Sequence, residues 1–157
     1  MKWALILGLV LAACGPSNAE IKTAKMARYA ASPQTLFDIA VNVTQRDYKI
    51  GEVDAEGARF ATAEQIYSAE GGRQSPGAGG FVNMGGGSIM LVLIVEVMSS
   101  DGGNVVVVTP KTFQMVSGSP KPRELTPDDP SVPGWVHGRV DALSVAIYQA
   151  AKQHTAP

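Results

Sequence analysis

The run IMLVLIVEVM, Ile89–Met98, determines the fold class of this chain. Nine of its ten residues are apolar and many are β-branched, which predicts a buried strand. The turn residues Ser99–Asn104 follow, and then a second apolar run, Val105–Thr109, which can continue past Pro110 to Val116. Two such runs joined by a glycine-containing turn predict a β-hairpin.

The first run is apolar on both faces of the predicted strand. One face carries five apolar side chains, and the other carries Met90, Val92, Ile94 and Met98, with only Glu96 polar. An antiparallel sheet with helices on one face normally alternates apolar and polar residues. The second face therefore needs a cover: the glycine-rich loop (residues 71–88), the proline-rich segment (residues 117–134), a partner protein or lipid. We expect the loops to cover it only in part and the remainder to bind a partner.

Two helices are predicted around this hairpin. Ser32-Pro33 is a helix start, with a serine cap and proline at the first helical position, and we expect the helix to end near Arg46 or Asp47. Its apolar stripe is Leu36, Phe37, Ala40 and Val43. The last helix runs from Trp135 to about Gln153. Its expected buried stripe is Val136, Val140, Leu143, Ile147 and Ala150.

The remaining strands complete an α+β fold. Ile21–Tyr29 is interpreted as a first strand, while Tyr48–Val53 and Ala58–Ala63 form a hairpin around the turn Asp54–Gly57. The predicted order is β-α-β-β-β-β-α, an antiparallel sheet of about four to five strands with two helices packed on one face. Residues 21–153 form the single domain, with flexible loops at 71–88 and 117–134.

The N-terminus has the organisation of an export signal. Lys2 precedes an apolar run, which ends at Leu11-Ala12-Ala13-Cys14 and contains the only cysteine of the chain. This tetrapeptide resembles the lipobox of bacterial lipoproteins. The resemblance implies a signal peptide at 1–13, cleavage between Ala13 and Cys14, acyl chains such as palmitate on Cys14, and a tether at 14–20. In such lipoproteins an aspartate after the cysteine favours inner-membrane retention, so by the same resemblance Gly15 implies the periplasmic face of the outer membrane.

Two alternatives exist for the leader. An uncleaved membrane anchor would need about 20 apolar residues, which this run lacks. An ordinary secretory signal would leave Cys14 there by chance.

Further resemblances concern the domain. The stretch Ala31–Ala40, ASPQTLFDIA, resembles the start of the first helix in helix-grip domains. The pattern of elements over residues 21–153 resembles small outer-membrane assembly lipoproteins, such as accessory subunits of the barrel-assembly machinery. These resemblances imply either an accessory interaction module of the cell envelope or, alternatively, a module that binds lipid or another apolar ligand between sheet and helix.

Composition narrows the choice of partners. Without Lys2, twelve basic and fourteen acidic residues remain, so nucleic acid is not an expected partner. An acylated Cys14 leaves no thiol for a disulfide. We expect a membrane contact through the acyl chains and an envelope protein as partner.

No motif predicts an enzyme, a cofactor or a metal centre. The glycine-rich loop lacks the lysine of a P-loop and precedes a strand. His137 and His154 have no partner set for zinc, although a triad of His137 with distant residues stays open. We interpret Asp128-Asp129 as favourable negative charge near a helix N-terminus and as turn residues, rather than as a cation site. Val92, Ile94 and Trp135 are the candidate partner surface, and Trp135 is alternatively a lid on the core.

Overall fold

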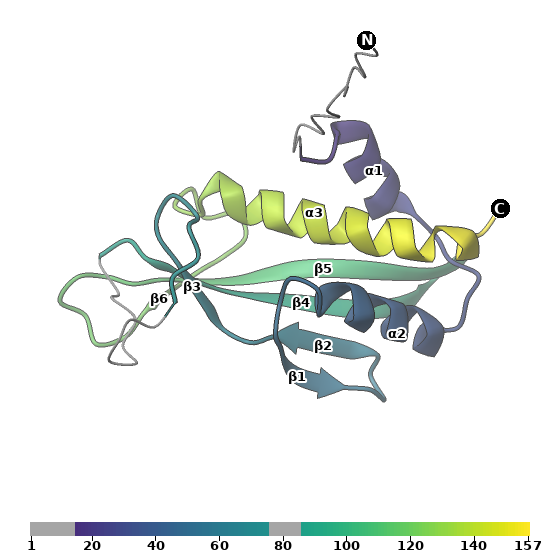
Figure 1. Ribbon diagram of the computed structural model, residues 1–157, viewed down its shortest axis with the longest axis horizontal. Coiled ribbons are helices and arrows are strands. Elements are labelled where there is room, and N and C mark those ends of the chain that lie inside the picture. The colour runs from purple at the N-terminus through teal and green to yellow at the C-terminus, as the bar shows by residue number, and fades with distance from the viewer. Residues whose placement is uncertain (1–14, 76–85) are drawn as a thin grey trace, which may run out of the picture.

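The computed structural model describes residues 15–75 and 86–157, and the predicted hairpin lies at its centre (Figure 1). Strand β4 (Ile89–Ser100) pairs with β5 (Gly103–Gln114) along its whole length, around a two-residue turn. Gly103 is required beside this turn. Its φ is +132°, and a Cβ there would lie 2.7 Å from the carbonyl oxygen of Tyr29.

Pro110 lies inside β5, where a proline normally disrupts pairing. Its partner in register is Leu93, whose N–H donates to the hydroxyl of Thr62 at 2.9 Å on the side away from β5. Leu93 and Pro110 are therefore a pair without mutual hydrogen bonds. The missing N–H of Pro110 faces the outer edge of β5, so no hydrogen bond to β4 is lost.

In the part of the chain that the structure describes, six strands form one antiparallel sheet. The order is β1-β2-β4-β5-β6, and β3 pairs with β4 next to β2. Strand β2 pairs with residues 94–96 of β4, and β3 pairs with residues 89–91. The shorter strands are β1 (Ile50–Asp54), β2 (Arg59–Thr62), β3 (Gln65–Tyr67) and β6 (Arg123–Leu125).

The prediction of an α+β fold with an antiparallel sheet is confirmed, but its element counts need correction. The described residues contain six strands rather than four to five, and three α-helices rather than two. Strand β6 is one addition, and it lies within the proline-rich segment 117–134 predicted to be a flexible loop. It has only three residues, and it pairs along the edge of β5, where prolines next to a strand are tolerated.

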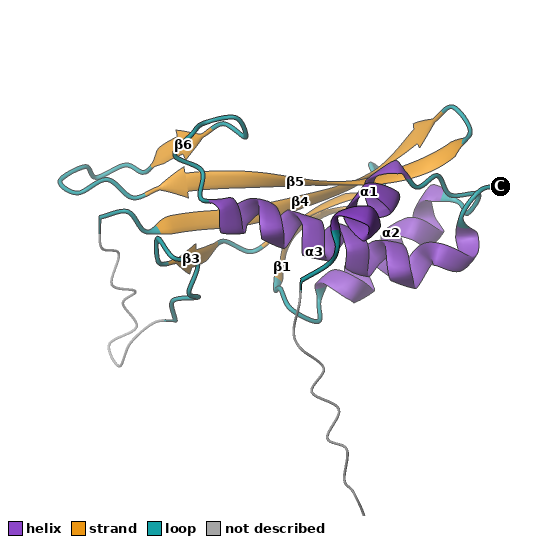
Figure 2. Ribbon diagram, turned by 90° about the horizontal axis from the view of Figure 1, so that it is seen from above, coloured by secondary structure: helices purple, strands orange, loops and turns teal. Residues whose placement is uncertain are grey.

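Helices α2 (Pro33–Thr44) and α3 (Gly134–Ala151) pack on one face of the sheet (Figure 2). The Ser32 hydroxyl accepts a hydrogen bond from the N–H of Thr35, which confirms the predicted cap. The stripe of α3 is buried as predicted except at its end, where Ala151 is buried and Ala150 is exposed. Ala151 follows Ile147 by four residues and so continues the same line along the helix.

The prediction of a strand at Ile21–Tyr29 is wrong. The segment Asn18–Met26 is helix α1, which packs against α3. Ser17 and Glu20 form a capping box, in which each side chain accepts a hydrogen bond from the other residue's backbone N–H. This helix also shortens the predicted tether, because only residues 15–17 precede it among the described residues.

The glycine-rich loop is described only at its ends. Residues 76–85, which make up most of the predicted flexible loop 71–88, lie outside the described residues. On its C-terminal side, the N–H of Gly87 donates to the carbonyl of Met115 at 3.0 Å, and the N–H of Met115 donates to the carbonyl of Ser88 at 2.8 Å. The end of this loop is thereby fixed next to the start of β4.

Leu143→Asp should destabilise the domain severely, because residue 143 lies on the buried stripe of α3 against the sheet. An unpaired buried carboxylate costs free energy comparable with a domain's whole stability, about 5–15 kcal/mol. Thermal unfolding followed by circular dichroism measures the effect. Ala142→Asp, at the exposed neighbouring position, is the control and should melt near the wild-type temperature. Equal melting of the two variants would contradict the packing of α3.

Candidate functional site

The sheet has one covered and one open face. Helices α2 and α3 lie on the same side of it (Figure 2), and α1 packs against α3. The odd-numbered residues of β4 from Ile89 to Val97 point toward the helices and are buried, whereas Met90, Val92 and Ile94 point to the other side and stay half-buried. The two-sided apolar character of this strand therefore reflects a covered face and an open face.

The open face continues across the hairpin. Cross-strand pairing places Phe113 beside Met90, Lys111 beside Val92, and Val107 beside Glu96. Farther along, Met98 is 51% exposed and pairs with Val105. An apolar band thus runs along both long strands, interrupted by single charged side chains.

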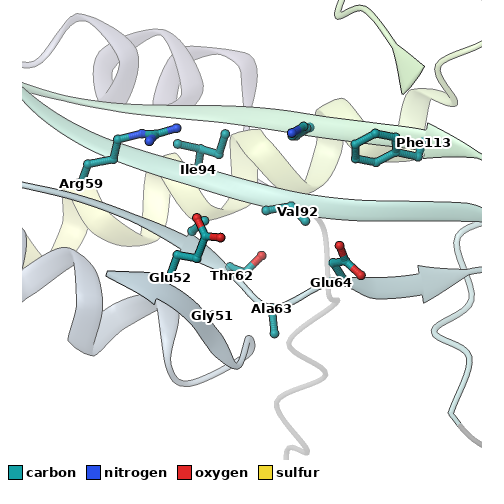
Figure 3. Close-up of a pocket in the computed structure, with 11 residues that line it drawn as sticks. Gly51, Glu52, Arg59, Thr62, Ala63, Glu64, Val92, Ile94 and Phe113 are labelled. Atoms are coloured by element: carbon teal, nitrogen blue, oxygen red, sulfur yellow. The ribbon is translucent and has the colours of Figure 1, made fainter. Parts of the chain in front are cut away.

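A hollow of about 330 Å³ lies in this face (Figure 3). Val92, Ile94 and Ala61 form its floor, at the end of β2 nearest β3. The hollow forms there because β2 ends at Thr62 and β3 begins at Gln65, so the two strands leave a gap along β4. The other lining residues are Gly51, Glu52, Arg59, Thr62, Ala63, Glu64, Lys111 and Phe113.

The charges around the hollow are separated by sign. Lys111 lies on β5 beside Val92, and the side chain of Arg59, from β2, reaches toward β4, whereas Glu52 and Glu64 lie on the other side of the hollow (Figure 3). Arg59 forms an exposed ion pair with Glu96, with Nε 3.2 Å from Oε1. Within residues 15–75 and 86–157, Lys111 forms no ion pair, and its ammonium group lies 5.4 Å from the ring centroid of Phe113. The hollow therefore offers an apolar floor with an available cation on one flank and two carboxylates on the other.

Trp135 is not part of this surface. Its ring packs against Tyr67 on the helix side of the sheet, with centroids 5.0 Å apart, and its Nε1 donates to the carbonyl of Ala69 at 2.9 Å. The structure thus brings Val92 and Ile94 together in the hollow and places Trp135 over one end of the core, as the lid alternative describes.

Trp135 belongs to a cluster that the sequence analysis missed. The guanidinium of Arg139 lies 4.3 Å from the centroid of Tyr67 and 5.4 Å from that of Trp135. Its Nη2 donates to the carbonyl of Gly71 at 3.0 Å, which ties the segment after β3 to α3. In the described part of the chain, the Tyr67 hydroxyl and Arg139 Nε are buried without hydrogen-bond partners, and the two aromatic faces add a favourable contact for the half-buried guanidinium.

The other candidates of the sequence analysis lie apart from the hollow. Asp129 Oδ1 accepts a hydrogen bond from the N–H of Ser131 at 2.8 Å, and hydrogen bonds from Ser131 lower the pKa of Asp129. This is the turn chemistry expected of Asp128-Asp129. His137 is exposed on α3 and His154 lies in the closing 3₁₀ turn. Among the described residues, no three His, Cys, Asp or Glu side chains gather closely enough to hold a metal ion.

Comparison with known protein families finds no family model that matches the chain, and no curated protein matches its sequence. None of the helices in the described ranges has both the length and the apolar composition needed to cross a membrane. Ala13 and Cys14 lie outside the described residues. The candidate site is therefore defined by the geometry of the open face.

Gly71→Ala should destabilise the cluster around Arg139. Gly71 has φ +90°, and a Cβ there would lie 2.8 Å from the Trp135 ring, so strain of about 1–3 kcal/mol is expected. Denaturant unfolding followed by Trp135 fluorescence measures this loss. Gly72→Ala is the matched control, since its Cβ would meet only the Ser68 hydroxyl at 3.4 Å. If both variants unfolded at the same denaturant concentration, the contact between Gly71 and Trp135 would be refuted.

Proposed function

We propose that this protein is a lipid-anchored accessory module of the cell envelope that docks a segment of a partner protein in the hollow of its open sheet face. The observation that carries the proposal is the apolar floor of Val92 and Ile94, which no described element of the chain covers. Uncovered apolar surface with a polar rim is typical of interaction sites. The separated charges on the two flanks would orient the bound segment.

The anchor in this proposal is Cys14. Its support is the lipobox resemblance of Leu11-Ala12-Ala13-Cys14, and Gly15 supports the periplasmic face of the outer membrane. Two or more acyl chains hold a protein stably on a bilayer. An anchored module with a free binding face is the design expected of an accessory subunit.

A partner segment is favoured over a ligand held between sheet and helices. The space between them is filled by buried side chains, among them Leu91, Leu93, Val140 and Leu143. A lipid bound in the manner of helix-grip domains would need this space. The hollow, by contrast, opens outward and has about the volume of a small ligand site, enough for a few side chains of a docked segment.

The lining of the hollow also favours binding over catalysis. Its described lining contains no histidine, cysteine or serine to form a nucleophile and base pair. The hydroxyl oxygen of Thr62 accepts the N–H of Leu93 and thereby completes the pairing of β4. The carboxylates of Glu52 and Glu64 lie across the hollow from Arg59 (Figure 3), and Lys111 lies on β5, so these charges can pair with charges of a bound segment.

The docking proposal can be tested by photo-crosslinking in cells that normally make the protein. A benzophenone side chain in place of Phe113 should crosslink one envelope protein, because residue 113 lines the hollow. Ile94→Lys should abolish that crosslink, since a charge replaces part of the apolar floor. Val107→Lys, on the same face but outside the hollow, should leave it intact.

Circular dichroism of the purified Ile94→Lys variant must accompany this test. We expect a wild-type spectrum and melting temperature, because the side chain faces outward. A folded variant that keeps the crosslink would contradict docking in the hollow. An unfolded variant would mean that the second face of β4 is ordinary core.

The anchor can be tested separately. Mass spectrometry of the mature protein should find Cys14 as the first residue, carrying acyl chains, and growth with labelled palmitate should label the protein. Cys14→Ser should remove the label and block maturation by the lipoprotein route. Unlabelled wild-type protein would refute the anchor without affecting the docking proposal.

A further inference from the structure

The structure places helix α1 very close to the proposed anchor. The capping box of Ser17 and Glu20 starts the helix at Asn18, so only residues 15–17 separate it from Cys14. An extended chain spans at most about 3.6 Å per residue, which limits the distance from Cys14 to Asn18 to about 14 Å. An acylated Cys14 lies at the membrane interface, so α1 cannot be far from the lipid headgroups.

Helix α1 is packed onto the rest of the domain. Its Ala24 is buried against α3, and Lys25 forms an ion pair with Asp141 of that helix. The chain after α1 is fixed to the C-terminal segment by two backbone hydrogen bonds. The N–H of Ala30 donates to the carbonyl of His154 at 2.8 Å, and the carbonyl of Arg28 accepts from the N–H of Ala156 at 2.7 Å. A short tether on a fixed helix therefore determines which side of the whole domain faces the membrane.

The surface on that side combines cations with an exposed apolar side chain. Lys22 and Met26 lie one turn apart on the same face of α1, and Arg28 follows the helix. Met26 is 64% exposed. These three residues border a shallow depression that Tyr148 and Thr155 also line. Within the described ranges, Lys22 forms no ion pair, and Glu20 is engaged by Ser17.

We propose that this surface, Lys22, Met26 and Arg28, rests on the anionic phospholipids of the membrane that holds the anchor. The proposal rests on the proposed function, because it requires an acylated Cys14. Lys22 and Arg28 would meet lipid phosphates, and the Met26 side chain would lie among the glycerol and upper acyl groups. Attraction between such cations and anionic lipid is typical of peripheral surfaces.

The orientation leaves the docking face free. Helix α1 packs against α3, which covers one side of the sheet (Figure 2), whereas the hollow of Val92 and Ile94 opens on the other side (Figure 3). Membrane contact and partner docking therefore use different faces of one rigid domain. A partner could reach the hollow without displacing α1 from the lipid.

The test uses the mature acylated protein in vesicles. Met26→Cys provides a unique thiol for a fluorophore, because an acylated Cys14 has none; Val53→Cys, exposed on β1, is the matched distant site. The vesicles contain three parts phosphatidylethanolamine to one part phosphatidylglycerol, with some lipid carrying a nitroxide on its headgroup. Fluorescence at residue 26 should be strongly quenched by this lipid, and fluorescence at residue 53 should not.

Charge variants test recognition of the headgroups. Lys22→Gln and Arg28→Gln, added to the residue-26 probe, should each shift the equilibrium between docked and undocked domain about fivefold. Lys49→Gln and Lys121→Gln, exposed elsewhere, should leave the quenching unchanged. In vesicles of phosphatidylcholine alone, the protein with unchanged Lys22 and Arg28 should show quenching at residue 26 as low as that of the glutamine variants.

The outcomes separate this proposal from the one it rests on. Mass spectrometry that finds Cys14 unmodified would overturn both. An acylated protein with equal quenching at residues 26 and 53 would overturn only the membrane-facing surface. The proposal would also be overturned if the strong quenching at residue 26 were the same in the glutamine variants and in vesicles without anionic lipid. The tether alone would then hold α1 near the bilayer.

Discussion

The pairing of β4 with β5 is the constraint on which the rest of this structure depends. Strands β2, β3 and β6 each pair with one of these two strands, and the helices pack on one face of them. Pro110 helps to set the register, because its ring nitrogen can face the outer edge of β5 but cannot donate to β4. A slip by one residue would turn that nitrogen toward β4 and exchange the buried and open faces.

The same hairpin explains why the open face is apolar. A strand paired on both sides favours β-branched side chains on each face, and β4 carries them on both. The helices bury one set, which includes Leu93 and Val95, while Val92 and Ile94 are left on the other side. The gap between β2 and β3 turns this exposed set into a hollow with charged flanks. An architectural irregularity thus gives the candidate binding site its shape.

Different contacts join the helices to the sheet at the two ends of the domain. At the end where β3 begins, Arg139 joins α3 to the segment around Gly71 through aromatic faces and one carbonyl. At the end where α1 lies, backbone bridges link Tyr29 to Asn104 and to Thr155. These ties make helices and sheet a single body, so a short N-terminal tether can orient the domain on a membrane while the open face stays accessible.

Local signals in the sequence determined the hairpin, the cap at Ser32 and the stripe of α3, because each depends on residues that are neighbours along the chain. They also indicated that the second face of β4 would need a cover. Helix α1 was missed because its apolar residues lack a clear period, and the informative signal was the Ser17 and Glu20 capping box. The hollow needed the tertiary structure, since Glu52, Arg59 and Lys111 come from three strands and only the pairing of those strands brings them around Val92 and Ile94.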